Sequence, residues 1–309
     1  MHTWLHRFCI LLAACTLLLV VAGGLVTSND AGLSVPDWPL SYGKLMPPMV
    51  GGIFYEHGHR MVATTVGLLT IILAVWLSLV EQRRWLRRLS WIALAAVVVQ
   101  GILGGLTVIY LLPKPVSIGH ACLAELFFST TVAMVVFTSR SWEQGPFLVG
   151  DSDWPSLHRL AVATPAVVLA QVALGAAARH SALGLIPHLV GALAVVAMVL
   201  WISFKVLVRC PEHPALRKSA LLLLGAALLQ VFLGVAAYMA RVAYGRSVSL
   251  TPWPPDALQP MPVMVLFTVA HVAMGALTLA ASVVLAIQVF RNVQREGPEF
   301  GSRRVAVTS

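Results

Sequence analysis

Five residues at the start of one long apolar segment combine acid, base and metal-ligand chemistry. They read Glu56-His57-Gly58-His59-Arg60. On a helix, Glu56 and His59 lie on nearly one face with Arg60 beside them, while His57 points almost the opposite way. An arginine in the first helical turn lies against the positive end of the helix dipole, which is unfavourable unless an anion lies close to the guanidinium group. The cluster predicts an anionic ligand, although a polar collar where a membrane helix meets water would also place charges here.

Histidines recur at or near the same end of three later apolar segments, at His120, His188 and His271. Two neutral imidazoles on facing helices can hold a porphyrin iron from both sides. The first half of the chain would pair His59 with His120. The second half would pair His188 with His271, which gives one haem in each half, and Arg60 would then bind a haem propionate. Any single histidine is more simply a hydrogen-bonded polar residue, but the recurrence disfavours that interpretation for all four, and zinc would need more ligands per half.

The composition excludes a water-soluble protein. Apolar residues make up 59% of the 309 residues, charged residues make up 11%, and the mean hydropathy is +0.86. Because every backbone polar group needs a partner in hydrocarbon and no alternating strands occur, we predict an all-α polytopic membrane protein. We expect the first segment to remain attached, because its apolar run is longer than that of a signal peptide. The eight segments long enough to cross about 30 Å of hydrocarbon are residues 8–28, 56–80, 91–112, 117–138, 158–179, 184–207, 219–243 and 263–290.

The distribution of positive charge predicts the orientation in the membrane. Lysines and arginines are concentrated in alternate connections and in the tail, and these sides should be cytoplasmic. They are Arg83, Arg84, Arg87, Arg88, Lys205, Arg209, Arg217, Lys218, Arg291, Arg295, Arg303 and Arg304. We therefore expect a plasma (inner) membrane protein with both termini in the cytoplasm and the four histidines toward the outer face. The net charge of +9 reflects this topology and indicates no nucleic-acid partner.

A five-residue element, Gln-x-x-Leu-Gly, repeats deep in three of the odd-numbered segments. It occurs at Gln100–Gly104, Gln171–Gly175 and Gln230–Gly234, and each copy is followed by a histidine that opens the next segment. The weakest copy is in the first segment, with Gly23 and Gly24 but no glutamine. Glycine allows helices to approach closely, and glutamine in a membrane hydrogen-bonds to a neighbouring helix. Alternatively the glycine makes room for a flat macrocycle, and both interpretations can hold together.

The repeats divide the chain into two pseudo-symmetric four-helix bundles. Residues 1–140 are expected to form the N-terminal bundle and residues 158–292 the C-terminal bundle. A polar linker over 141–157 contains several Gly, Pro and Asp residues, and a tail follows over 293–309. Both the linker and the tail are expected on the cytoplasmic side.

Two outer connections are much longer than the others, over residues 29–55 and 244–262. Both are rich in tryptophan and proline, which is typical of an ordered cap at the membrane interface. The residues concerned in the second connection are Pro252, Trp253, Pro254 and Pro255. We expect this asymmetry to give the two halves different roles on one scaffold.

The remaining chemical groups give weaker signals. Cys9, Cys15, Cys122 and Cys210 lie in or near spans or in a cytoplasmic connection, so no pair is placed to form a disulfide outside. Glu125 lies just over one helical turn beyond His120. A carboxylate inside a membrane is a functional candidate by default, yet it could also pair with one of the deep glutamines.

Two motifs stand close together before the second apolar segment. The first outer loop reads Gly-Leu-Ser-x-Pro-Asp-Trp-Pro-Leu-x-x-Gly over residues 32–43, and Glu-x-x-His-Arg follows over 56–60. With the single histidines of the later segments, this combination resembles the haem A synthase family over residues 23–290 or so. Many members of that family carry two cysteines in this loop, where this chain has Val35 and Ser41. A thiol step therefore cannot be general to the reaction.

The resemblance implies an enzyme that oxidises the C8 methyl group of haem O to a formyl group, making haem A for terminal oxidases. It implies that His59 and His120 bind the substrate haem, and that His188 and His271 bind a resident haem B. The first assignment agrees with Glu56, which lies about one turn, or roughly 5 Å, from His59. Our hypothesis is that Glu56 acts on the methyl group, either by taking up a proton or by stabilising positive charge.

Expected partners follow from the same resemblance: a haem O synthase that delivers the substrate, a membrane electron donor and assembly factors of a terminal oxidase. Association with further copies of the chain is compatible with the sequence, and no motif indicates it. No motif indicates the oxygen source or whether a hydroxylated intermediate is released. Two other functions remain open. A di-haem b electron carrier would also need two bis-histidine sites but would place them toward both faces, and a repeat-built transporter would leave the shared position of the histidines unexplained.

Overall fold

The computed structural model describes residues 3–248 and 261–295, and long helices dominate this part of the chain. Eight of the described helices are long and apolar enough to cross a membrane, so this is a multi-pass membrane protein, as predicted. They are α1 (Thr3–Ser28), α2 (Gly51–Val80), α3 (Arg84–Ile109), α4 (Lys114–Phe137), α6 (Leu157–Arg179), α7 (Leu185–Arg209), α8 (Pro214–Val248) and α9 (Pro262–Asn292).

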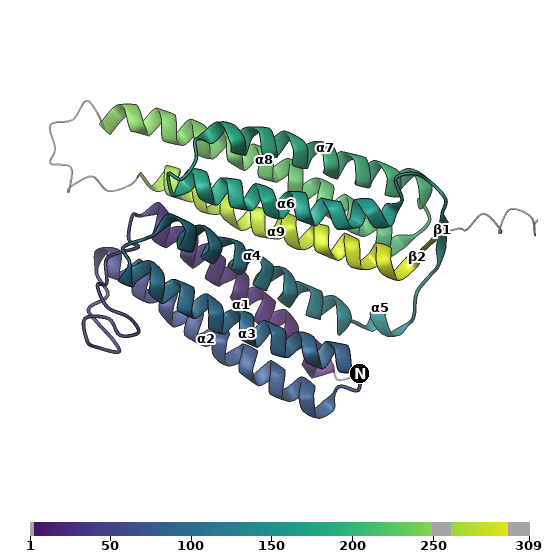
Figure 1. Ribbon diagram of the computed structural model, residues 1–309, viewed down its shortest axis with the longest axis horizontal. Helices are drawn as coiled ribbons and strands as arrows, with labels where there is room; N and C mark the ends of the chain where they lie inside the picture. The colour runs from purple at the N-terminus through teal and green to yellow at the C-terminus, as the bar shows by residue number, and fades with distance from the viewer. Residues whose placement is uncertain (1–2, 249–260, 296–309) are drawn as a thin grey trace, which may run out of the picture.

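The helices form two groups of four (Figure 1). In the first group, α1 contacts α2 and α4, and α3 completes the ring between them. In the second group, α6 contacts α7 and α9, and α8 completes the ring. We call these the N-terminal and C-terminal bundles. They meet where α9 packs on α1 and α4, and where α4 packs on α6.

The two ends of the bundles differ in what they carry. Helices α2, α4, α7 and α9, which contain the four histidines, all begin at the end on the left of Figure 1. We call it the histidine end. Helices α1, α3, α6 and α8 begin at the opposite end, which we call the arginine end because α3 opens there with Arg84, Arg87 and Arg88.

Apolar side chains fill the interior of each bundle near the arginine end. Leu12, Leu77 and Met134 are almost fully buried in the N-terminal bundle. Between the bundles the packing uses small residues, since Phe128 of α4 lies against a cluster that includes Ala276 of α9. Small side chains let membrane helices approach, which favours close packing where α9 meets the first bundle.

The expected linker and tail contain regular structure that the sequence analysis missed. Helix α5 (Arg140–Glu143) follows α4, and strand β1 (Val149–Asp151) pairs in parallel with β2 (Val293–Arg295). Asp151 accepts a hydrogen bond from the backbone N–H of Leu157 at 2.5 Å, which ties β1 to the start of α6. The pairing is long-range, and a three-residue strand has no periodic signal in the sequence.

Two of the sequence-based expectations fall partly or wholly on residues outside the described ranges. The second outer connection was expected over 244–262, but α8 continues to Val248, and the expected cap residues Pro252, Trp253, Pro254 and Pro255 lie outside the described part of the chain. Arg303 and Arg304 of the expected tail lie outside it as well.

Candidate functional site: two pairs of histidines

Each of the four histidines packs against a glycine of the preceding long helix. A Cβ atom on any of these glycines would lie between 2.8 and 3.3 Å from the Cε1 atom of the histidine ring. Such spacing is tighter than ordinary van der Waals contact, so only glycine admits the ring without a shift. The pairs are Gly23 with His59, Gly104 with His120, Gly175 with His188 and Gly234 with His271.

The glutamines of the repeated element reach the same histidines. Gln100 Nε2 donates to the backbone oxygen of His120 at 2.9 Å, and Gln171 Nε2 donates to that of His188 at 2.8 Å. The predicted hydrogen bond from a membrane glutamine to a neighbouring helix is therefore confirmed in these two copies. In the third copy the glutamine backbone oxygen approaches the ring Nδ1 of His271 instead, at 3.2 Å.

The two histidines of the C-terminal bundle lie face to edge, with ring centroids 6.2 Å apart and an interplanar angle of 88°. A metal ion held by one nitrogen of each imidazole at roughly 2 Å would place the centroids about 6 Å apart. A proton on His271 Nδ1 would be donated to the Gln230 carbonyl and would leave Nε2 with a lone pair. The residues present therefore fit an iron held between His188 and His271.

His59 and His120, the two histidines of the N-terminal bundle, lie near the starts of α2 and α4, at the histidine end. Their Nδ1 atoms are buried and have no hydrogen-bond partner among the residues that the structure describes. A buried polar atom without a partner is costly, so each such atom needs an explanation. Nδ1 of each ring faces the preceding helix, within 3.7 to 3.9 Å of a Cβ placed on Gly23 or Gly104, so it is not the nitrogen that a metal would use. A haem iron would be ligated through Nε2 of His59 and His120, which these residues allow.

Glu56 and Arg60 form an ion pair that holds the first outer loop against α2. Glu56 is 4% exposed, and its Oε1 accepts from Arg60 Nη2 at 2.7 Å while its Oε2 accepts from the backbone N–H of Val35 at 2.8 Å. Arg60 Nη1 donates to the backbone oxygens of Asp37 and Leu40, both at 2.8 Å. We call this set of contacts the loop clamp.

The loop clamp corrects one step of the sequence argument. Arg60 was placed in the first helical turn, but α2 begins at Gly51 rather than at residue 56, so the first-turn placement is wrong. Gly51 takes a backbone φ of +54°, which lets the helix start earlier, above the apolar segment. In the structure the anion that pairs with Arg60 is Glu56. The expected contact of Arg60 with a haem propionate stays a prediction.

The outer loop has its own internal hydrogen bonds. The Asp37 carboxylate accepts from the backbone N–H groups of Tyr42 at 2.6 Å and Gly43 at 2.8 Å, both of which have positive φ. These N–H groups, that of Gly43 first, hold the pKa of Asp37 below its ordinary value. Tyr42 Oη donates to the Ser34 backbone oxygen at 2.8 Å. The loop is thus an ordered cap, as its composition predicted.

Trp38 of this cap packs onto α3 beside the histidine site. A Cβ on Gly105 would lie 2.7 Å from the Trp38 ring, and the preceding residue, Gly104, is the one that admits His120. At the two positions where related proteins were expected to carry cysteines, Val35 is fully buried and Ser41 Oγ is 2.8 Å from the Nδ1 of His57. Hydrogen bonds therefore attach the loop at both positions.

The remaining candidates do not join these sites. Glu125 is buried in α4, and its Oε2 has no hydrogen-bond partner among the described residues. Within those residues, no three His, Cys, Asp or Glu side chains converge as a metal site would require. Two cavities, of about 320 and 640 Å³, both lie near the arginine end, and no histidine lines either of them.

Comparison with known proteins decides the family. A sequence model described as cytochrome oxidase assembly protein matches residues 6–52 and 49–187, more than half of the chain. The chain belongs to this family, whose members include the haem A synthases. The matched residues contain His59, His120 and the loop clamp and end just before His188, so the family match itself covers the N-terminal site alone.

Individual relatives of this family bear the name heme A synthase. One from Symbiobacterium thermophilum is 34% identical over 176 residues, covering 54% of this chain and 56% of the relative. One from Alkalihalophilus pseudofirmus is 29% identical over 149 residues, covering 47% and 49%. The chain thus spans about half the length of several of these relatives. One from Shewanella oneidensis is 23% identical over 309 residues, covering 80% and 90%.

Proposed function

We propose that this protein is a haem A synthase that oxidises the C8 methyl group of haem O to a formyl group. Family membership supports a role in haem A biosynthesis for oxidase assembly. The observation that carries the finer proposal is the pair of bis-histidine arrangements, one in each bundle and both at the histidine end. Within residues 3–248 and 261–295, Glu56 stands three residues from His59 of the N-terminal arrangement, and neither His188 nor His271 has a carboxylate so placed on its helix.

In this proposal the N-terminal bundle binds the substrate. His59 and His120 ligate the haem O iron and so fix the position of the porphyrin edge. Gly23 and Gly104 keep the rings at the depth that this requires, since any larger residue would press on them. The cap with Trp38 lies next to this site and would limit the access of water from the outer side.

The C-terminal bundle would hold a resident haem B between His188 and His271. When bound, haem B would supply a one-electron redox centre between the membrane electron donor and the N-terminal site. Gln171 approaches Nδ1 of His188 with its amide nitrogen, at 3.0 Å, and this donor could not accept a proton from a ligating His188. The Gln230 carbonyl, 3.2 Å from Nδ1 of His271, could accept the proton of that ring and so orient it. Hydrogen bonds to the second imidazole nitrogen are the usual means by which a protein orients a metal-ligating histidine.

Glu56 is the group that we propose acts on the methyl carbon as it is oxidised. Both carboxylate oxygens already accept hydrogen bonds, so Glu56 could take up a proton only if a contact to Arg60 or Val35 opened. Stabilisation of positive charge needs no such opening, and we favour it of the two roles. Arg60 would bind a propionate only through guanidinium N–H groups that do not already donate to Glu56 or to the outer loop.

We further propose a plasma membrane location with both termini in the cytoplasm. Arginines near the arginine end, among them Arg83, Arg84, Arg87 and Arg88, favour the cytoplasmic side for that end, and the histidine end would then face outward. A haem O synthase would deliver the substrate, a membrane electron donor or acceptor would exchange electrons with the resident haem, and assembly factors of a terminal oxidase would receive the product.

The direct test is expression of the full chain together with a haem O synthase in a host that makes no haem A. Haems are then extracted from membranes and separated by liquid chromatography with mass detection. We expect a formyl haem of the mass of haem A, present only when both proteins are expressed. Bound haem B with unchanged haem O would contradict the proposal and favour a di-haem electron carrier.

A further inference from the structure

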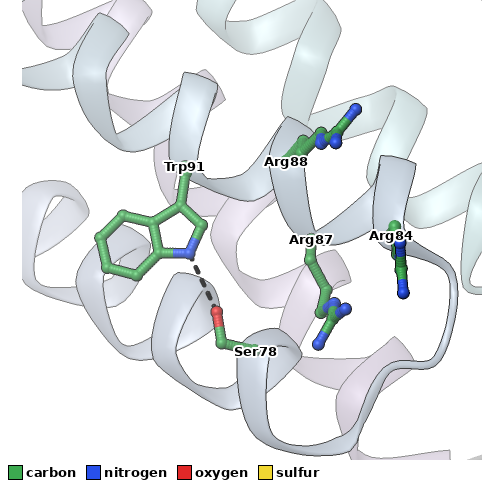
Figure 2. Close-up of a pocket in the computed structure, with 5 residues that line it drawn as sticks. All are labelled: Ser78, Arg84, Arg87, Arg88 and Trp91. Carbon is green, nitrogen blue, oxygen red and sulfur yellow. Dashed lines mark hydrogen bonds between the residues drawn. The ribbon is translucent and has the colours of Figure 1, made fainter.

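Three arginines and one tryptophan share a face at the start of α3. Arg84, Arg87, Arg88 and Trp91 are spaced i, i+3, i+4 and i+7, which places them on one side of the helix. Together with Ser78 at the end of α2 they line the cavity of about 320 Å³ (Figure 2). The figure shows Arg84 and Arg87 extending toward the connection between the two helices, while Arg88 extends another way.

Among the residues that the structure describes, the charges of this cluster have no counter-ion. None of Arg84, Arg87 and Arg88 forms an ion pair with any residue that the structure describes. Their neighbour Arg83, by contrast, contacts the Glu81 carboxylate at 2.8 Å, and this pair holds the pKa of Glu81 below its ordinary value. The one nearby carboxylate is therefore already used.

The cluster also lies where positive charge is least favourable. It occupies the first turns of α3, against the positive end of the helix dipole, and like charges at i and i+4 repel each other. An external anion that contacted these guanidinium groups would relieve both effects. Guanidinium groups bind phosphate oxygens through paired hydrogen bonds, which makes phosphate the best-matched anion.

Surface residues around the cavity indicate a membrane lipid as the source of that phosphate. Leu79 is 78% exposed and Ile92 is 62% exposed, so apolar surface continues from the cavity along α2 and α3. Trp91 is half exposed, and its indole N–H donates to Ser78 Oγ at 2.9 Å, a placement typical of tryptophan at the membrane interface. The cavity therefore lies at headgroup level, above a surface suited to acyl chains.

We propose that this cavity binds the phosphodiester headgroup of an anionic phospholipid. Arg84 and Arg87 contact the phosphate, Arg88 adds positive charge at the wall of the cavity, and the acyl chains lie along the exposed apolar faces of α2 and α3. Basic pockets between membrane helices are suited to anionic headgroups, because a fixed cluster of cations adds to the attraction of each one. The site is separate from the histidine pairs and does not depend on the proposed oxidation of haem O.

The test is lipid binding by the purified full chain in a neutral detergent, measured by native mass spectrometry. Phosphatidylglycerol is titrated with phosphatidylcholine as the neutral comparison, for the unaltered chain and for R84Q/R87Q/R88Q. The control is R217Q/K218Q, which removes two exposed cations in the first turns of α8 that do not line this cavity. We expect about a tenfold loss of phosphatidylglycerol affinity in the triple variant and little change in the control.

Two further measurements keep the result unambiguous. Should the triple variant fail to give monodisperse protein, R87Q alone tests the half-buried arginine and should weaken binding by about threefold. Inorganic phosphate at millimolar concentration should not displace the lipid. Equal binding by the unaltered chain and the arginine variants would overturn the proposal. So would full displacement by inorganic phosphate, which would identify a soluble anion site instead.

Discussion

The two bundles present their histidines in the same way and differ in what surrounds them. In both, a glycine of one helix admits a histidine ring of the next. In the C-terminal bundle, as far as the structure describes it, Gln171 and Gln230 contact the rings. In the N-terminal bundle an ion pair and an ordered cap lie beside the site. The difference teaches that the same glycine–histidine packing can have different surroundings in the two bundles, which is what our proposal of one reacting and one resident haem requires.

The cap depends on a second glycine that the other bundle lacks. We call the four glycines that contact the histidine rings the framework glycines. Gly105 follows the framework glycine of α3, Gly104, and contacts Trp38. The matching positions in α6 and α8 are occupied by Ala176 and Val235. A Cβ at Gly105 would overlap the indole ring. The distinction between the bundles therefore extends into the helices and is not confined to the loop.

The largest expected effect is that of Glu56→Ala on product formation. Loss of the Glu56 carboxylate should lower haem A formation by at least about 100-fold, while haem B remains bound. Haem extraction and chromatography from co-expressing cells measure both quantities. Arg60→Ala is the comparison variant, because it removes the ion pair with Glu56 and the contacts of Arg60 to the loop but keeps the carboxylate and its bond to Val35, so haem A formation should fall less. Normal product from Glu56→Ala would show that the two sites do not differ in the proposed way.

Replacing a framework glycine by alanine should weaken haem binding more in the C-terminal bundle than in the N-terminal one. In Gly175→Ala and Gly234→Ala the new Cβ would lie 2.9 and 2.8 Å from the histidine ring, against 3.3 Å in Gly104→Ala. We expect about a tenfold loss of haem B affinity in the first two, and less disturbance of haem O binding in the third. Haem titration followed by absorbance measures this.

The control for this series is Gly225→Ala, in the same helix as Gly234. A Cβ at Gly225 has no neighbour within 4 Å, so haem binding should be unchanged. Full haem B affinity in Gly175→Ala and Gly234→Ala would mean that the rings can shift without loss of ligation.

Gly105→Ala should loosen the cap without touching the histidines directly. The added methyl group would force Trp38 away from α3, and overpacking of this kind typically costs about 1–3 kcal/mol. Trypsin cleavage after the exposed Lys44 should become about tenfold faster, because the loop opens more often. Gly101→Ala, where nothing lies within 4 Å, should leave the cleavage rate unchanged. Equal rates in both variants would contradict the proposed anchoring of the cap.

The smallest expected effect is the pH dependence of the cap. The folded pKa of Asp37 is below its ordinary value, so the stabilisation that its carboxylate gives is complete above about pH 4 and is lost as the pH falls through the folded pKa. Protection of the Tyr42 and Gly43 amides from hydrogen exchange should fall by roughly threefold over that range. In Asp37→Asn the protection should be low and independent of pH. An unchanged pH response in that variant would assign the effect to another group.

The helices and the histidine pairs could be predicted because their signals are periodic or local. Each span is a continuous apolar run, His120, His188 and His271 each follow a Gln-x-x-Leu-Gly copy, and His59 stands in the Glu-x-x-His-Arg motif, so pattern alone located them. The β1–β2 pair and the loop clamp could not be found this way. Both join segments that are distant in sequence, and Val35 contributes only a backbone N–H, which any residue except proline provides.

Arg60 was expected in the first turn of its helix, where the helix dipole disfavours positive charge, but it lies further along α2. The dipole argument required an anion near the guanidinium group, and the structure supplies one in Glu56. The start of α2 at Gly51 was not visible from hydropathy, because Gly51 and Gly52 belong to neither the apolar run nor a typical helix start. Because the expected start of α2 was a few residues too late, a haem propionate was expected as the anion beside Arg60, where the structure has Glu56.

The central claim, one porphyrin in each bundle, is tested most directly by haem analysis of two double variants supplied with haem O. His188→Ala/His271→Ala should lose haem B and keep haem O, and His59→Ala/His120→Ala should lose haem O and keep haem B. Either double variant retaining both haems in the amounts found in the unaltered chain would contradict the claim.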